Sequence, residues 1–411
     1  MSEPNIPTKP DRRLTRWLRK SSKRGSTPSG LEALWASRDQ PASNRLISLD
    51  VFRGITIAGM VLVNNPGTWA HIYWPLAHAE WHGWTPTDLI FPFFLFIVGV
   101  AIPLALGKRV ERGDQRRDLI LKIVYRSLVI FLLGEFLAGF PYFHLSTIRI
   151  PGVLQRIAVC YFLASIIYLT TRPRTTAIII VALAVVYCLL MKYVPAPGFY
   201  AGDLSKEGSL ASYIDRRIFG PHIWKQGVVY DPEGLLSTMG ALATTLLGVL
   251  TGNRLRCKDR TPIEKVAHMF IAGICCLIIG WVWNAWFPIN KSLWTSSYVF
   301  FTGGLALQFL ALCYWLIDIK GYQAWTKPFV IFGVNAIVLF VGTGLMARTM
   351  GLIKLSRPDG SLQSLQSFIY GHGFASWLSP LNASLAYAIA FILLWLFLMW
   401  LLYRKRIIVK I

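Results

Sequence analysis

The sequence predicts an all-α, polytopic membrane protein with about ten transmembrane helices and both termini in the cytoplasm. Of its 411 residues, 54% are hydrophobic and only 15% are charged, whereas a soluble domain has about 25% charged residues. Apolar runs recur along the chain, each close to the roughly 20 residues that a helix needs to cross the hydrocarbon core. A large soluble helical core does not produce so many runs of this length.

The chain divides into a polar tail and an apolar body. Residues 1–45 are basic and lack the apolar segment of a signal peptide, so we expect a disordered cytoplasmic tail, or a short helix on the membrane surface. Residues 46–411 are expected to form one transmembrane domain. Its predicted spans are 46–65, 89–106, 119–140, 151–171, 176–191, 235–250, 263–286, 293–317, 329–346 and 381–403.

The distribution of charge orients these spans. The net charge of +22 would suit nucleic acid, but Lys and Arg also collect in the cytoplasmic loops of membrane proteins. Most of the 42 Lys and Arg residues fall in the two ends of the chain and in alternate loops, which favours an even number of spans. The expected partner is therefore the lipid bilayer, not nucleic acid. The six cysteines have neither CxxC nor Cys/His metal spacing, so no metal site is expected.

Charged residues near the cytoplasmic ends of the spans need an explanation, because charge within a span is costly and usually functional. Arg53 and Arg126 lie inside spans, and Lys108 and Arg109 lie just outside one. The phosphates of a nucleotide cofactor would find cationic groups there. The alternatives are anchoring of the spans, strongest for Lys108 and Arg109, and an ion pair between Arg53 and Asp50.

The outer ends of the spans carry a different set of side chains. Acidic and aromatic residues gather there with one arginine: Glu80, Trp81, Asp88, Glu135, Arg156, Asp231 and Glu233. Acidic groups would attract a cationic amine or a sugar, and tryptophans can stack on sugar rings. An aromatic belt at the membrane interface explains many of the tryptophans equally well.

His78 is the candidate proton acceptor, because histidine accepts protons near neutral pH. It lies in the predicted outer loop 66–88, ten residues before Asp88. A carboxylate at the start of a helix can orient such an imidazole. Taken alone this pattern is weak, since a histidine in a loop is more often structural.

Six sequence blocks, in order, resemble the membrane domain of heparan-α-glucosaminide N-acetyltransferase and its bacterial relatives among N-acetylglucosamine utilisation proteins. The blocks are 50–54, 78–83, 88–93, 149–156, 230–236 and 290–299. The resemblance implies transfer of an acetyl group from cytoplasmic acetyl-CoA, as co-substrate, to a glucosamine amine across the membrane. His78 matches the family's active-site histidine and Asn64 its active-site asparagine, with Asn65 as a substitute.

This resemblance suggests a mechanism. The phosphates of acetyl-CoA lie near Arg53 and Arg126, and an amino sugar enters from the periplasmic side. His78 acts as general base, and Asn64 donates a hydrogen bond to the developing oxyanion. A route through acetyl-His78 stays open, as does a homodimer. The basic tail replaces the lumenal region of the lysosomal protein, so we expect a multi-pass protein of the cell inner membrane.

Two other classes of function compete with this interpretation. An inner-membrane permease for N-acetylglucosamine or a related sugar would also need a polar helix bundle. The sequence shows no internal repeat of the kind found in many transporters, which argues mildly against it. A structural membrane protein would leave charged residues inside the spans, such as Arg126 and Glu135, without a purpose.

Overall fold

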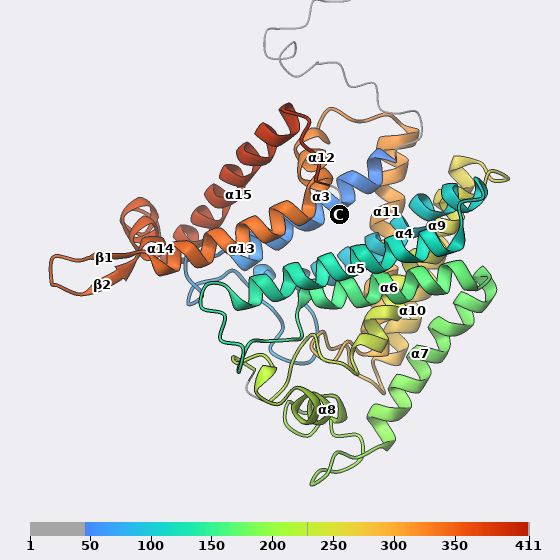
Figure 1. Cartoon of the computed structure of the whole chain (residues 1–411), viewed down its shortest axis with the longest axis horizontal. Coiled ribbons are helices and arrows are strands. Elements are labelled where there is room, and N and C mark those ends of the chain that lie inside the picture. Colours follow the sequence, from blue (N-terminus) through green and yellow to red (C-terminus); the bar gives the residue numbers. More distant parts are fainter. Residues whose placement is uncertain (1–45, 228, 410–411) are drawn as a thin grey trace, which may run out of the picture. The chain divides into compact units, whose positions relative to one another are not determined.

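The computed structural model describes residues 46–227 and 229–409, which are mostly helical (Figure 1). The predicted all-α, polytopic class is confirmed, while the predicted tail, 1–45, lies outside the described residues. The α-helices are α3 (Ile47–Asn64), α4 (Ile90–Glu111), α5 (Arg116–Gly139), α6 (Val153–Thr170), α7 (Pro173–Tyr193), α8 (Leu210–Phe219), α9 (Thr238–Arg256), α10 (Pro262–Trp283), α11 (Ser296–Cys313), α12 (Lys327–Val334), α13 (Ala336–Leu352), α14 (Leu365–Tyr370) and α15 (Pro380–Arg404). A hairpin of β1 (Lys354–Ser356) and β2 (Leu362–Ser364) joins α13 to α14.

Each predicted span coincides with a long helix or with the pair α12–α13. Within the described chain, seven helices are long and apolar enough to cross a membrane, and the pair would make an eighth. The other two, α5 and α9, are more polar. α5 carries Lys122, Arg126 and Glu135, and α9 is rich in Gly and Thr. Ten crossings and two cytoplasmic ends therefore stay predictions.

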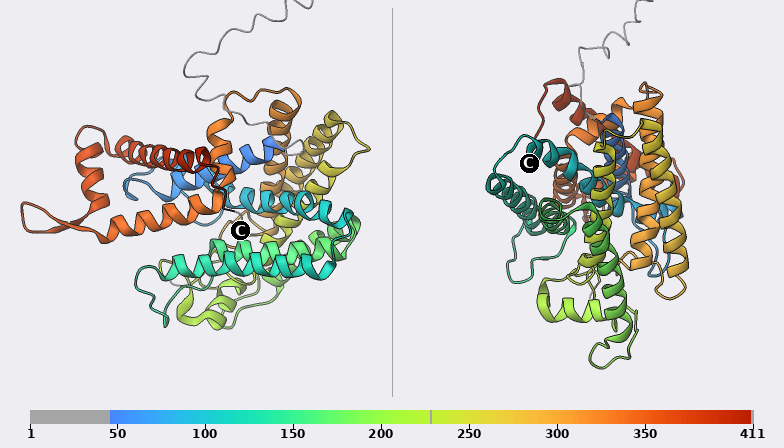
Figure 2. Two further views of the ribbon diagram at one scale, coloured as in Figure 1. Left: turned by 45° about the horizontal axis from the view of Figure 1, so that its top comes forward. Right: turned by 90° about the vertical axis from the view of Figure 1, so that its right-hand side faces the viewer.

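The helices pack through close contacts between backbones. α4 lies against α9, α5 against α6, and α10 against α11 (Figure 2). At Gly99 of α4, an added Cβ would lie 1.9 Å from the carbonyl oxygen of Thr245 in α9. Small residues allow such approaches between helices in membranes. The main hydrophobic core lies between α4, α6, α9 and α11, where Leu95, Leu246 and Tyr298 are fully buried.

The predicted span 329–346 is two helices, α12 and α13, which meet at an angle of 81°. The break falls at Asn335, whose backbone is not helical. Its side chain binds the segment after α15, donating to Ile407 O and accepting from Val409 N, each at 3.0 Å. These bonds tie the break between α12 and α13 to the segment that follows α15.

Gly54 sets the distance between α3 and α12. A Cβ at this position would lie 1.8 Å from the carbonyl oxygen of Phe329, so we expect Gly54→Ala to push the helices apart and cost about 1–3 kcal/mol of stability. Thermal unfolding in detergent measures this loss. Gly59→Ala on the same helix is the matched control, because its Cβ would meet the Ile90 side chain at an ordinary 3.4 Å. Equal unfolding temperatures for the two variants would contradict this account of the packing.

Candidate active site

Asp88 is fixed at the start of the helix that leads into α4. It lies in the 3-10 turn Pro86–Leu89, where proline suits the first position because it has no N–H to leave unpaired. Its side chain is 1% exposed. The oxygen Oδ2 accepts hydrogen bonds from Ala79 N (3.0 Å) and Thr85 N (3.1 Å). The bond to Thr85 is the reach-back contact of a capping box, so the carboxylate has a defined position.

The imidazole of His78 lies against this carboxylate, with Nδ1 2.6 Å from Asp88 Oδ1. An ionised carboxylate only accepts hydrogen bonds, so Nδ1 donates, and the lone pair of a neutral ring is on Nε2. The His78 side chain is 48% exposed, which leaves the ring open to a ligand. The predicted contact between His78 and Asp88 is therefore present. It has the geometry of a general base and the group that orients it.

Lys291 completes this group, although the sequence did not single it out. It lies between α10 and α11, and its Nζ is 3.0 Å from His78 Nδ1, 3.2 Å from His78 Nε2 and 3.5 Å from Asp88 Oδ1. A lone lysine in a loop carries no local signal of such a role. The one available hint was its place in the sequence block 290–299.

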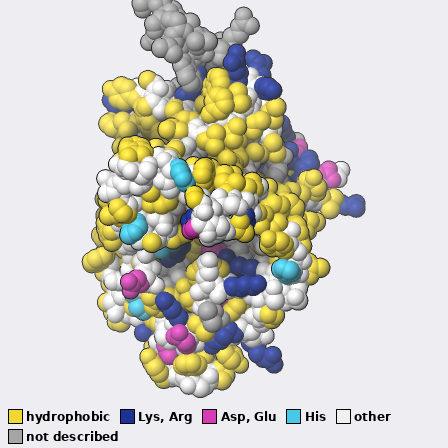
Figure 3. Space-filling model, turned by 90° about the vertical axis from the view of Figure 1, so that its left-hand side faces the viewer, with side chains coloured by type: hydrophobic (Ala, Val, Ile, Leu, Met, Phe, Trp, Pro, Cys, Tyr) yellow, Lys and Arg dark blue, Asp and Glu magenta, His cyan; other side chains and the backbone are white. Residues whose placement is uncertain are grey.

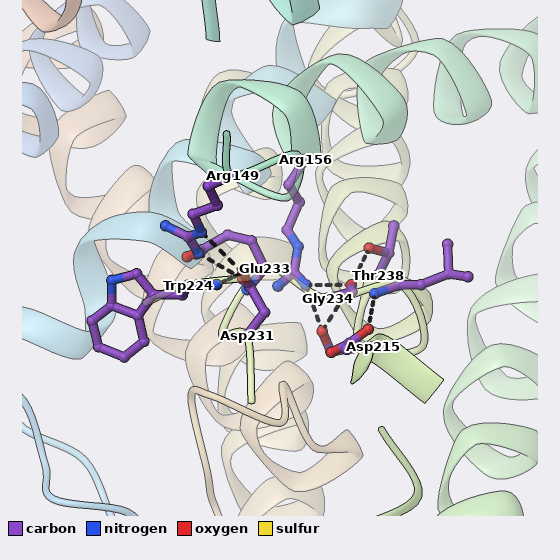
Figure 4. A network of polar contacts seen from close by, with 10 residues as sticks. Arg149, Arg156, Asp215, Trp224, Asp231, Glu233, Gly234 and Thr238 are labelled. Carbon is purple, nitrogen blue, oxygen red and sulfur yellow. Dashed lines mark hydrogen bonds and ion pairs between the residues drawn. The ribbon is translucent and has the colours of Figure 1, made fainter. Parts of the chain in front are cut away.

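A second charged cluster contains two of the predicted substrate residues (Figure 4). Arg149 donates to Asp231 through Nε (2.9 Å) and Nη2 (2.6 Å), and Nη2 also donates to Glu233. Such two-point contacts are strong and directional. Asp231 also accepts from the backbone N–H of Trp224 and of Glu233. Asp231 and Glu233 were singled out from the sequence, whereas their partner, Arg149, was missed.

Arg156 lies beside this cluster and is 2% exposed. Its Nη2 donates to Gly234 O and Ser237 Oγ, and its guanidinium lies 5.2 Å from the ring centre of Trp294. Among the described residues, Nε and Nη1 of Arg156 have no hydrogen-bond partner. Buried donors without a partner are costly, so this guanidinium suits an oxygen atom supplied by a ligand or by water.

Lys291 connects the two groups electrostatically, because it interacts with both Asp88 and Glu233. Burial lowers the pKa of Lys291, and these two carboxylates oppose the shift. For Glu233, burial acts to raise the pKa, but Arg149, Arg156 and Lys291 outweigh it and hold the pKa below its ordinary value. The oppositely charged neighbours of both side chains therefore favour their charged forms, against the effect of burial.

Aromatic rings border the same region. Trp81 and Tyr230 pack edge to face with ring centres 5.0 Å apart, and Trp224 packs against Tyr230 at 5.7 Å. The indole N–H of Trp81 donates to Leu204 O at 2.8 Å, which fixes that ring. The predicted substrate residue Trp81 thus belongs to a rigid aromatic group beside the Arg149 cluster.

Two predicted outer residues lie apart from these contacts. Asn64 is the last residue of α3 and is exposed. In the described part of the chain, no hydrogen bond joins it to His78 or Asp88. The substitute, Asn65, is buried, and its amide donates to Val61 O. Glu80 is exposed next to Trp81.

The predicted cofactor residues lie on different helices. Arg53 contacts Asp50 and the carbonyl oxygen of Gly333 in α12, each at 3.3 Å. Arg126 is exposed on α5, 5.4 Å from the ring centre of Tyr161. Lys108 and Arg109 lie in the last turn of α4. The predicted ion pair between Arg53 and Asp50 is therefore present, whereas Arg126 lies on the surface of the protein.

The surface around the loops after α3 and α5 is mixed in polarity. Figure 3 views the side of the molecule where the loops after α3 and α5 lie. Hydrophobic side chains dominate its upper part, whereas charged and histidine side chains gather in the lower half. Trp69, Trp74 and Tyr142 of these loops are exposed. Such aromatic side chains are typical of the interface between lipid and water.

Asp215 of α8 makes the stability of this region depend on pH. Burial raises the pKa of Asp215 to about 7, against the hydrogen bond that it accepts from Leu235 N. The folded protein therefore keeps a proton that the unfolded chain releases near pH 3.8. The resulting stabilisation is present below that pH and is lost as the pH rises through about 7. A pKa shift of this size corresponds to roughly 4 kcal/mol in the free energy of unfolding.

We expect Asp215→Asn to remove this dependence. Compared with the unchanged protein, the variant should gain stability as the pH rises from about 5 to about 8. Thermal unfolding in detergent at several pH values measures the difference. A difference that stays constant over this range would show that Asp215 ionises normally in the folded protein.

Comparison with known proteins identifies relatives of this chain. Residues 45–211 match the family described as "Heparan-alpha-glucosaminide N-acetyltransferase, catalytic". The mouse heparan-alpha-glucosaminide N-acetyltransferase is 32% identical over 357 residues, which is 73% of this chain and 53% of the mouse protein. The human protein is 32% identical over 352 residues, or 72% of this chain and 52% of its own length. The chain thus spans about half the length of the curated relatives that it matches.

Proposed function

Because the chain belongs to the heparan-alpha-glucosaminide N-acetyltransferase family, we propose that it is a membrane N-acetyltransferase. It moves an acetyl group from cytoplasmic acetyl-CoA to the amine of a glucosamine-type sugar on the periplasmic side. The observation that carries this proposal is the contact between His78 and Asp88. It supplies an oriented base at a half-exposed position.

The acceptor amine must lose a proton before or during its attack. His78 Nε2 takes this proton, while Asp88 holds Nδ1 and stabilises the imidazolium that forms. General-base catalysis of this kind contributes about 10²- to 10⁴-fold in rate. Asn64 donates a hydrogen bond to the oxyanion from the end of α3. Asp88 thereby positions His78 and does not itself exchange protons with the substrate.

The acceptor sugar binds between the aromatic group and the charged cluster. Trp81 stacks on its ring, and the two unpaired donors of Arg156 bind a sugar oxygen. Glu80 and Glu233 favour the cationic amine over neutral sugars. Asp231 has its oxygens engaged by Arg149 and by backbone N–H groups, so it acts by holding Arg149 in place.

Acetyl-CoA approaches from the opposite end of the bundle. Arg53, Arg126, Lys108 and Arg109 bind its phosphates, and no metal takes part. Between Arg53 and Asn64 the helical rise is about 16 Å, which the extended pantetheine arm has to cover to bring the thioester to His78. The protein lies in the cell inner membrane in this proposal, as a single transmembrane domain over 46–411. A homodimer is compatible with this scheme.

Release of free CoA tests the proposal directly. Purified protein in detergent is given acetyl-CoA and glucosamine, and both CoA and N-acetylglucosamine are measured. Formation of the two products in equal amounts is expected. If no CoA is released, and sugar crosses liposomes that contain the protein but no acetyl-CoA, the chain is a permease.

A further inference from the structure

Lys291 brings a positive charge to the His78 ring. Its Nζ lies 3.0 Å from Nδ1 and 3.2 Å from Nε2. The two ring nitrogens point in different directions, so a donor almost equally far from both is not in line with the lone pair on Nε2. The distance to Asp88 Oδ1, 3.5 Å, is longer than a usual N–H···O hydrogen bond. The ammonium is therefore held mainly by charge and can direct an N–H group at a further acceptor.

The segment that carries Lys291 is firmly built. Asn290 is fully buried, and its Oδ1 accepts from Leu293 N at 2.8 Å while its own N–H donates to Thr295 Oγ1. Trp294 is 1% exposed and has a φ of 51°, a conformation that a bulky residue adopts only where its surroundings enforce it. Lys291 thus projects from a rigid support rather than from a mobile loop.

Acetyl transfer creates a negative charge close to this ammonium. The amine nitrogen attacks the thioester carbon, a C–N bond forms, and the carbonyl π electrons move to oxygen while Nε2 takes the amine proton. The carbonyl then reforms, the C–S bond breaks, and the CoA thiolate leaves and takes the proton from Nε2. An amine about 3 Å from Nε2 places the carbonyl oxygen within reach of a donor that is itself 3.2 Å from Nε2.

We propose that Lys291 is a catalytic residue whose ammonium binds the oxyanion of the tetrahedral intermediate. This inference rests on the proposed acetyl transfer. Asp88 and Glu233 oppose the lowering of the Lys291 pKa that burial causes, and so favour the charged ammonium. A charged donor aimed at developing charge in a shielded site typically contributes a factor of about 10² to 10³ in rate. Lys291 and Asn64 are then both donors to the oxyanion in the proposed reaction.

The test compares Lys291→Met, which keeps the length of the side chain and removes the charge, with Lys291→Arg, which keeps the charge. Initial rates of CoA release are measured over a range of acetyl-CoA and glucosamine concentrations, together with unfolding temperatures in detergent. Lys225→Met is the matched control, because Lys225 contacts the Thr147 hydroxyl at the surface and not His78. We expect Lys291→Met to lower kcat about 10²- to 10³-fold with little change in either KM, and Lys291→Arg to recover part of the loss.

Three results would overturn the inference. Unchanged kcat in Lys291→Met would exclude a role in the reaction. A loss of kcat that follows a fall in unfolding temperature, with no recovery in Lys291→Arg, would assign Lys291 a structural role only. Failure of the unchanged protein to release CoA would contradict the proposed function itself. If the unchanged protein is active and substitution of Lys291 leaves kcat unchanged, only this inference fails.

Discussion

Replacing His78 with alanine is expected to reduce kcat for acetyl transfer by about 10²- to 10⁴-fold, the usual contribution of a general base. Its Nδ1 is held by Asp88, so the variant loses a base that is already oriented. The KM for acetyl-CoA should change little, because the proposed phosphate sites lie at the other end of the bundle. Coupled measurement of CoA release and N-acetylglucosamine formation gives both constants.

His71→Ala is the control for this experiment. His71 lies in the same loop and is exposed, but it lines a small pocket with Leu76 and Leu381 rather than the Asp88 site. We expect it to keep the activity of the unchanged protein. A His78→Ala variant that is as active as His71→Ala would exclude His78 as the base.

Replacing Arg149 with alanine is expected to lower stability by about 3–5 kcal/mol, the usual cost of removing one partner from a buried ion pair. The side chains of Asp231 and Glu233 are 0% and 9% exposed, so the substitution would deprive two buried carboxylates of the cation that contacts both. Burial of unpaired charge is among the most destabilising changes in proteins. Thermal unfolding in detergent at neutral pH measures the effect.

Arg217→Ala provides the comparison, because Arg217 is exposed on the neighbouring helix α8. Loss of an exposed arginine should change stability by no more than about 0.5 kcal/mol. Arg149→Lys should fall between the two, since lysine keeps the charge but cannot make the two-point contact with Asp231. Equal unfolding temperatures for Arg149→Ala and Arg217→Ala would show that the cluster contributes little to folding.

Much of the fold could be predicted from local patterns. The ten apolar runs coincide with helices because burial in lipid requires long, internally hydrogen-bonded segments. The break between α12 and α13 was missed, because the residues on both sides of Asn335 are equally apolar. What sustains the break is a contact with Ile407 and Val409, far along the chain, which no local pattern indicates.

The candidate site also combines residues that the local sequence indicates with residues whose place depends on distant contacts. The pattern of a histidine ten residues before a carboxylate at the start of a helix is weak by itself, and the resemblance to the acetyltransferase family is what singled out His78. Lys291 lies 213 residues beyond His78, and its role depends on how the segment before α11 packs against the loop after α3. Arg126 was expected inside the bundle, but position along a span does not reveal which face of the helix a residue occupies. The structure places it at the surface.

The central claim is that donor and acceptor reach His78 from opposite faces of one bilayer. Sealed liposomes with the protein in one known orientation test it most directly. Acetyl-CoA is placed only on the side of the chain termini and glucosamine only on the other side. We expect CoA to accumulate on the side of the termini and N-acetylglucosamine on the opposite side, in equal amounts. Product that forms only when both substrates share one side would contradict it.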